Sequence, residues 1–376
     1  MEIKVSRIPF PVSRLVMLAI ICIILISDLK SQSLSFNGQI SSWGTGVRIN
    51  ENWNGSYGLR YIPQFNCNYY LNEDDVLNTE ILLNTYYITD FTTSELKFKL
   101  YRAIFRYSTV QSELQIGLQK INFGPAKLLR PLMWFDRIDP RDPLKLTDGV
   151  YALRFKYSFP NNSLLWLWCL FGNTDTKGYE LLPTEKRAPE VGGRFQFPAF
   201  DGEIGTTFHT RRVDASFYYY WENRYALDGR WDFGIGLWFE SVWQQNISSL
   251  TTYKWNRMTT LGADYTIPVA NGIYIMAEHL QITSSYSFWN TNQSRQISAT
   301  MISYPIGMLD NISLQEYYDW DNKNIYQYFQ FQRSYDNFII NLALFHYPEN
   351  GGSLFLNGGT SLLSGYGLQM MLVFNY

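Results

Sequence analysis

The sequence predicts an all-β protein, a transmembrane antiparallel up-and-down β-barrel of about 18 strands with one inward-folded loop. Three observations predict this fold. Apolar and polar residues alternate along segments of about ten residues or more, the length that a tilted strand needs to cross a bilayer. Aromatic residues gather at the ends of these segments, where a barrel meets the membrane–water interfaces. The last segment, 366–376, alternates without a break up to a terminal aromatic residue, Tyr376.

The composition excludes several other classes of protein. Aromatic residues make up 17% of the 376 residues, which excludes disorder, because disordered chains are poor in aromatics. The scarcity of Ala/Glu/Lys/Leu patterning excludes a coiled coil, and a single apolar run excludes a helical membrane protein. The formal net charge of −2 provides no bulk field for nucleic acid. Three cysteines are too few for a disulfide scaffold or a four-ligand zinc site.

Residues 1–33 are predicted to be a secretory signal peptide, which leaves 34–376 as the mature barrel. Lys4, Arg7 and Arg14 precede an uncharged run, 15–27. As a helix this run spans about 20 Å, less than the roughly 30 Å of a bilayer core. Small residues suit cleavage after Ser33. The alternatives are cleavage after Ser31 and an uncleaved anchor.

The strands are predicted from alternation, which is clearest in 57–71. There Tyr57, Leu59 and Tyr61 share one face, whereas Arg60 and Gln64 lie on the other. A soluble sandwich would bury the apolar face, but soluble strands average about five or six residues, so the longer segments favour a membrane barrel. An alternative of roughly 16 strands stays open, because 284–337 is difficult to divide. The eighteen predicted strands are 36–49, 56–70, 76–89, 95–108, 111–122, 150–159, 163–172, 191–199, 202–211, 223–233, 236–246, 254–267, 272–283, 294–304, 312–321, 325–334, 337–346 and 364–376.

The connections alternate between short and long, as in barrels that have tight turns at one end and loops at the other. The short links are 72–75, 160–162, 200–202, 234–236, 268–271 and 334–337, and the long ones are 123–149, 173–190, 212–222, 284–293 and 347–363.

Segment 95–108 breaks the alternation. Leu96, Phe98 and Leu100 share a face, and so do Tyr101, Ala103, Phe105 and Tyr107, but the two sets are out of step. A β-bulge near Leu100–Tyr101 restores the pattern and places Lys97, Lys99, Arg102 and Arg106 in the lumen. A Lys or Arg that faced lipid at the midplane would cost roughly 2–4 kcal/mol.

Residues 123–149, called the constriction loop below, form the longest connection. The middle of the loop is too apolar to extend into water, and four prolines stiffen it. We therefore expect it to fold inward and to constrict the lumen. The alternative is an outer lid packed on its neighbours. The residues predicted to form the constriction are Lys127, Arg130, Trp134, Asp136, Arg137, Asp139, Arg141 and Asp142.

The predicted lumen face is rich in cations. Besides Arg48, the basic wall comprises Arg60, Lys97, Lys99, Arg102, Arg106, Arg154, Lys156, Arg194, Arg211, Arg224 and Arg230. Acidic candidates are fewer, namely Glu80, Glu113, Glu203, Asp228, Asp232 and Asp264. A wall of one sign would favour anions. The alternative is that these arginines pair with carboxylates and merely fill the lumen.

No catalytic, metal or cofactor site is predicted. His209, His279 and His346 lie on separate predicted strands, and no spacing marks a catalytic triad or a zinc site. Phosphate-binding and dinucleotide-binding fingerprints do not occur.

Three segments resemble known outer-membrane proteins. The terminal strand 366–376 resembles the C-terminal strand of Gram-negative outer-membrane barrels, which their assembly machinery reads. Residues 119–124, QKINFG, followed by Asp136, Asp139-Pro140 and Asp142-Pro143, resemble a motif of alginate-export-like porins, although Lys120 and Phe123 depart from it. Residues 222–241, ENRYALDGRWDFGIGLWFES, resemble porin-like proteins of Bacteroidetes.

The resemblance implies a porin of the cell outer membrane with passive or weakly selective transport, and it does not name the solute. The cationic lumen face adds the hypothesis that the small hydrophilic solutes are anionic or sugar-like. The implied partners of the porin are outer-membrane lipid, the assembly machinery and the solutes, with homo-oligomerisation left open. Two alternatives are a non-conducting barrel within a secretion or surface-polysaccharide assembly, and an outer-membrane hydrolase.

Overall fold

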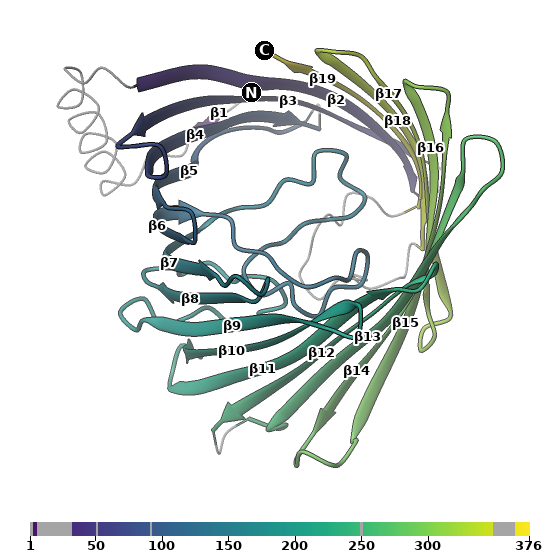
Figure 1. The fold of residues 1–376 in the computed structure, drawn as a ribbon. Helices are drawn as coiled ribbons and strands as arrows, with labels where there is room; N and C mark the ends of the chain where they lie inside the picture. The colour runs from purple at the N-terminus through teal and green to yellow at the C-terminus, as the bar shows by residue number, and fades with distance from the viewer. Residues whose placement is uncertain (1–2, 6–31, 50–51, 91, 249–250, 349–364) are drawn as a thin grey trace.

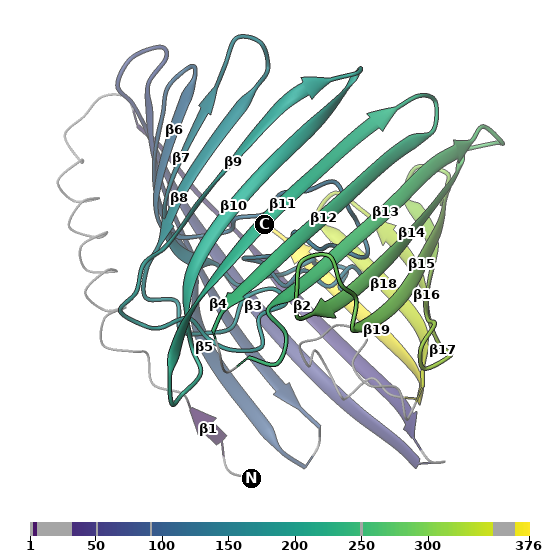
Figure 2. The same cartoon turned by 90° about the horizontal axis from the view of Figure 1, so that it is seen from below.

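The computed structural model describes residues 3–5, 32–49, 52–90, 92–248, 251–348 and 365–376. Eighteen strands, β2 to β19, form one closed antiparallel barrel, in which each strand pairs with its neighbour in sequence and β19 pairs with β2 (Figures 1 and 2). Of the described segments, only β1 (Ile3–Val5) lies outside this order, pairing in parallel with β5. No helix in the described ranges is long and apolar enough to cross a membrane.

The strand count of eighteen is confirmed, and every predicted strand corresponds to an observed one. The predicted signal segment 1–33 lies outside the described residues except for β1 and the first residues of β2, so its cleavage stays a prediction. The barrel strands are β2 (Gln32–Ile49), β3 (Asn52–Tyr70), β4 (Val76–Thr89), β5 (Ser94–Ser108), β6 (Ser112–Gln119), β7 (Val150–Ser158), β8 (Leu164–Leu170), β9 (Glu190–Ala199), β10 (Gly202–Asp214), β11 (Tyr219–Asp232), β12 (Gly236–Ile247), β13 (Trp255–Ile267), β14 (Ile273–Ser285), β15 (Gln293–Ile306), β16 (Asp310–Asp319), β17 (Asn324–Ser334), β18 (Phe338–Tyr347) and β19 (Gly365–Asn375).

The two ends of the barrel differ, as the alternation of connections predicts. Short links such as 109–111 and 200–201 lie at one end, called the turn end, together with the start of β2 and the end of β19. The loop end carries the long connections 120–149 and 171–189. The predicted long link 212–222 is wrong. Strands β10 and β11 stay paired up to Asp214 and Tyr219, so that only residues 215–218 connect them.

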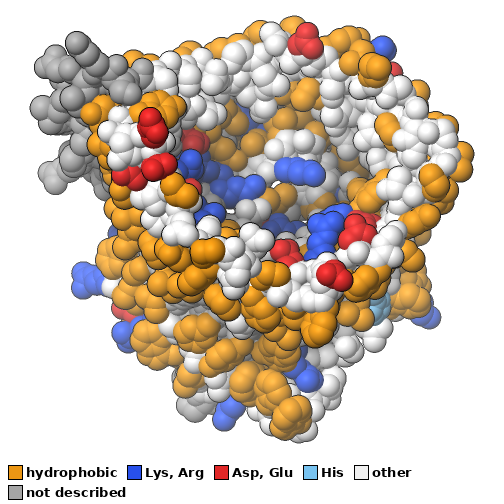
Figure 3. Space-filling model, in the orientation of Figure 1, with side chains coloured by type: hydrophobic (Ala, Val, Ile, Leu, Met, Phe, Trp, Pro, Cys, Tyr) orange, Lys and Arg blue, Asp and Glu red, His pale blue; other side chains and the backbone are white. Residues whose placement is uncertain are grey.

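The outer wall is apolar, and aromatic side chains meet at both of its ends. Leu59, Phe105 and Leu342 are among many large apolar side chains that are exposed, and Figure 3 shows such side chains over the outside of the barrel. At the turn end the ring centroids of Phe338 and Phe374 lie 4.7 Å apart. Ring pairs near the loop end include Trp255–Phe288 at 5.0 Å and Tyr318–Trp320 at 4.9 Å. The apolar content of the sequence thus forms an outer skin.

The predicted bulge in β5 is present. Leu82 pairs with Arg102 and Leu83 with Leu100, so Tyr101 has no partner across the ladder. Tyr101 is buried, and its hydroxyl accepts a hydrogen bond from Thr147 N at 3.1 Å, so its predicted place on the same face as Ala103 is wrong. The extra residue restores the alternation, so that the lysines before it and the arginines after it both face the lumen.

The predicted lumen position of Arg48 is also wrong. Trp43, Thr45 and Val47 turn inward, and Val47 is buried, which places the exposed Arg48 on the outer face. Arg48 lies one residue from the end of β2, where a long cationic side chain reaches water without crossing the apolar wall.

Candidate functional site in the barrel lumen

The constriction loop folds into the lumen, as predicted, and contacts the wall in several places (Figure 1). After leaving β6 it reaches β12 to β14, and its Pro140 carbonyl oxygen accepts a hydrogen bond from Gln315 of β16 at 3.4 Å. It returns to β5, where the Arg102 guanidinium donates to Thr147 O at 2.8 Å. The alternative of an outer lid is therefore excluded.

Two buried carboxylates fix the loop to the wall opposite its origin. Glu278 of β14 accepts hydrogen bonds from the backbone N–H groups of Lys127, Leu128 and Leu129 at 2.6–2.9 Å. Glu240 of β12 accepts from Ala126 N at 2.8 Å and Leu132 N at 2.9 Å. Sequence reasoning missed both glutamates.

Glycine is required at position 124, where the loop meets Glu240. Gly124 has a φ of +93°, and a Cβ there would lie 2.3 Å from the nearer Glu240 carboxylate oxygen. A side chain would therefore push the loop away from its anchor.

The apolar middle of the loop packs on β8 to β10. Phe123 stacks on Trp168 with ring centroids 5.6 Å apart, and Phe135 meets His209 edge-on at 5.0 Å. Leu129 and Leu132 are also buried. Because these side chains fill the space between loop and wall, the loop closes part of the cross-section instead of crossing open water.

Three residues predicted to line the constriction are instead enclosed. Trp134 and Asp136 are only 2% and 1% exposed, and Arg130 is paired with Asp136 at 2.9 Å. Burial favours this pairing, since an unpaired charge would lose its hydration without compensation.

The other predicted loop residues retain more contact with the lumen. Lys127 pairs with Asp264 of β13 at 2.6 Å, and Arg141 pairs with Asp139 at 2.7 Å. Arg137 is exposed and donates to Thr176 of the next long loop. Burial raises the pKa of Asp142, and the positive charge of Arg60 opposes this shift.

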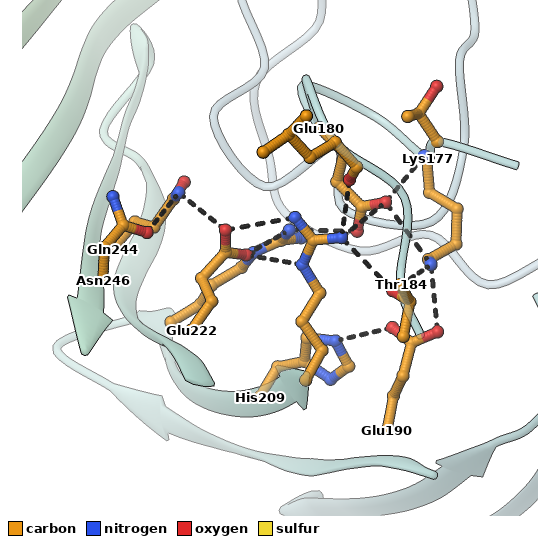
Figure 4. A network of polar contacts seen from close by, with 12 residues as sticks. Lys177, Glu180, Thr184, Glu190, His209, Glu222, Gln244 and Asn246 are labelled. Atoms are coloured by element: carbon orange, nitrogen blue, oxygen red, sulfur yellow. Dashed lines mark hydrogen bonds and ion pairs between the residues drawn. The ribbon is translucent and has the colours of Figure 1, made fainter. Parts of the chain in front are cut away.

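A second connection, 171–189, also folds inward, and sequence reasoning missed this. Glu180, at its centre, contacts Arg211 of β10 at 3.2 Å and Arg224 of β11 at 2.9 Å (Figure 4). Glu222 joins the same two arginines from the other side, at 2.7 and 2.6 Å. Lys177 pairs with Glu190 at 2.9 Å, and Glu190 in turn contacts His209 at 3.3 Å.

Three arginines of the predicted open wall are therefore part of balanced, buried pairs. Arg211 and Arg224 belong to the network of Figure 4, and Arg194 holds Asp228 at 2.5 Å. For these three residues the prediction of an unpaired cationic wall is wrong, and the alternative, that the arginines pair with carboxylates, is correct. The strand pattern places an arginine in the lumen, but the carboxylates that neutralise it come from nearby strands, from loop 171–189 and, for Arg224, from Glu222 two residues away on the same strand.

The two inward loops touch at Gly178, and this contact can be tested. Gly178 has a φ of +48°, and a Cβ there would lie 1.8 Å from Met133 O of the constriction loop. We expect Gly178→Ala to lower the unfolding temperature of the barrel in detergent by more than Gly172→Ala. Gly172 also has a positive φ, +75°, but its Cβ would meet nothing within 4 Å, so Gly172→Ala carries only the left-handed backbone cost of about 1–2 kcal/mol. Equal effects would contradict the contact.

Seven of the remaining wall cations lie on β3 to β7, where positive charge exceeds negative charge, and the eighth, Arg230, is on β11. Arg60 lies beside the rings of Trp43 and Tyr86, 5.0 and 5.6 Å from their centroids. Lys97 pairs with Glu95, and Lys99 with Asp148, each at 2.7 Å. Figure 3 shows the barrel mouth hollowed, with Lys and Arg side chains inside it. Arg106, Arg154 and Lys156 surround one carboxylate, Glu113, and Arg230 is exposed near the turn end of β11.

The three histidines lie in unrelated places. His209 is buried in the lumen wall against Glu190. His279 and His346 are on the outer face, where His279 Nδ1 lies 2.9 Å from Ser298 Oγ and His346 stacks on Tyr366. Glu278, the neighbour of His279 in sequence, points to the opposite face and binds the constriction loop.

No family model matches the sequence, and no curated protein matches it. Solved structures match the fold. OccAB4 from Acinetobacter baumannii aligns with a TM-score of 0.59 at 8% identity, and OpdQ from Pseudomonas aeruginosa with 0.57 at 9%, each alignment covering 93% of this chain and 99% of the other. The fold is similar to that of outer-membrane porins. OmpF from Salmonella typhi, in complex with daunomycin, aligns with a TM-score of 0.52 at 9% identity over 91% of this chain and 97% of its own.

Proposed function

We propose that this protein is a porin-like channel of the outer membrane, through which small hydrophilic solutes diffuse passively. The observation that carries the proposal is the constriction loop anchored across a charged lumen, because a loop in this place narrows a barrel of this size. The apolar outer wall suits lipid, and the terminal strand 366–376, which closes the barrel on β2, is the proposed contact with the assembly machinery.

We further propose that the channel prefers anions. The balanced pairs on β9 to β11 cancel their own charge, whereas β3 to β7 carry Arg60, Arg102 and the three cations around Glu113. Asp142 of the constriction loop interacts electrostatically with Arg60, so the loop places a carboxylate near this mainly positive wall.

Planar-bilayer recordings in a potassium chloride gradient test both proposals. We expect stepwise conductance and a reversal potential of the sign set by chloride, and Arg60→Gln should move that potential toward zero because it removes lumen charge. A cation preference would overturn the selectivity. Absence of conductance, together with stable co-purification with periplasmic proteins, would instead favour a barrel that serves a secretion or polysaccharide assembly.

A further inference from the structure

A compact group of cations lies on the inner wall near the turn end. Arg154 of β7 contacts Glu113 of β6 at 2.9 Å, Arg106 of β5 lies 3.5 Å from the same carboxylate, and Lys156 of β7 lies 3.9 Å from it. Three positive charges thus share one negative charge. We call Arg106, Glu113, Arg154, Lys156 and the neighbouring Trp166 the basic patch.

The patch differs from the other charged groups of the lumen in balance and in access. The network around Glu180 and Glu222 is neutralised and buried. In the basic patch the side chains of Arg106, Glu113 and Lys156 remain 32%, 28% and 29% exposed, so lumen water reaches them, whereas Arg154 is buried between them and the wall. An uncompensated positive patch in contact with water attracts anions from the lumen.

Trp166 of β8 completes the patch. Lys156 Nζ lies 3.9 Å from the centroid of its ring, and Arg154 Cζ lies 5.5 Å from it. The indole N–H is buried and has no hydrogen-bond partner within the part of the chain that the structure describes. The patch therefore presents the Arg106 guanidinium and the Lys156 ammonium to the lumen. Behind them lie the buried Arg154 guanidinium and the unpartnered, buried indole N–H of Trp166.

We infer that the basic patch binds a phosphate-type dianion, either inorganic phosphate or a phosphate monoester, as it passes through the lumen. The inference rests on the proposed channel function. Guanidinium groups match tetrahedral oxyanions through paired N–H donors, and lysine adds a point charge. A dianion neutralises the excess of two positive charges, which a chloride ion does not. The ring of Trp166 would contact the organic part of a monoester.

The full mature chain in planar bilayers provides the test. Chloride current is recorded while inorganic phosphate, and separately glucose 6-phosphate, is added at constant ionic strength. We expect each to reduce the chloride current with saturation. Arg154→Gln and Lys156→Gln should raise the half-blocking concentration by about tenfold, equivalent to 1.4 kcal/mol. Glu113→Gln should lower it, because the competing carboxylate is removed.

Arg333→Gln is the matched control, since Arg333 forms an exposed pair with Asp310 outside the patch and should not affect block. If the ester blocks at a lower concentration than phosphate, and Trp166→Ala removes this difference, the ligand is assigned as a monoester. Equal half-blocking concentrations would assign inorganic phosphate. If the protein conducts chloride but neither phosphate nor the ester blocks the current with saturation, the inference is overturned, whereas the proposed channel function is retained. No chloride conductance at all would overturn the channel itself. If Glu113→Gln and Arg154→Gln change the half-blocking concentration in the same direction, the patch has a structural role, and the inference that it binds the anion is overturned.

Discussion

Replacing Glu240 and Glu278 together by glutamine is expected to release the constriction loop and raise the single-channel conductance. The two carboxylates accept five backbone hydrogen bonds from the loop, and Glu278 also accepts one from Trp238 Nε1 at 3.0 Å. Each hydrogen bond to a charged acceptor contributes about 1.5–3 kcal/mol. A glutamine keeps one acceptor oxygen and turns an NH₂ donor toward backbone donors, so that several of these bonds are lost.

The measurement is conductance and current noise in planar bilayers, combined with limited trypsin cleavage after Lys127, which is followed by Leu128. Glu316→Gln is the matched control. Glu316 points to the outer face of the barrel, whereas its neighbour Tyr317 is buried on the inner face. Glu316 accepts a hydrogen bond from Gln327 at 2.7 Å and lies on the opposite side of the wall from the constriction loop. If the double variant conducts and resists trypsin as the control does, the anchoring by these carboxylates is refuted.

Glu222→Ala is expected to destabilise the barrel by about 3–5 kcal/mol, the usual effect of removing one partner from a buried ion pair. Arg211 and Arg224 would then be left with Glu180 as their remaining carboxylate in the network of Figure 4. Loop 171–189 should loosen with them, because Glu180 attaches it to both arginines. Unfolding in detergent, followed by the heat-dependent shift in gel mobility, measures the stability, and trypsin cleavage near Lys186 reports the loop.

The control for this variant is Glu185→Gln in the same loop. Glu185 pairs with the half-exposed Arg212 at 3.0 Å, and a pair of this kind contributes about 0–1 kcal/mol. Comparable stability of the two variants would show that the buried network does not hold the loop.

The strands could be predicted from sequence because their information is local. Alternation fixes which face each residue takes, and even the bulge at Tyr101 follows from two sets of apolar residues that are out of step. The inward course of the constriction loop also follows locally, from apolar residues too numerous to leave in water. The predicted lumen position of Arg48 is wrong because alternation with the inward-facing Val47, and not the charge of Arg48, sets its face.

The partners of the lumen charges could not be predicted in the same way. Glu240 and Glu278 bind a loop more than 100 residues away in sequence, and they do so through backbone N–H groups, which leave no side-chain pattern to read. A usable sign was present at Glu278, whose carboxylate shares a face with the apolar Met276 and Leu280. The inward course of loop 171–189 depends on Glu180 meeting Arg211 and Arg224 of the adjacent strands β10 and β11, a contact that alternation within a strand does not specify.

The pairing of β19 with β2 has a consequence for the order of folding. Phe374 lies opposite Ile40, and Tyr376 N donates to Gly38 O at 3.1 Å, so the ladder that closes the barrel joins residues more than 300 positions apart. The loop-closure entropy for this contact must be overcome before its hydrogen bonds form. Until residues 365–375 arrive, β2 and β18 each present an open sheet edge, which lipid cannot satisfy. Closure is therefore expected to be the late, cooperative step of folding, after the hairpins have formed.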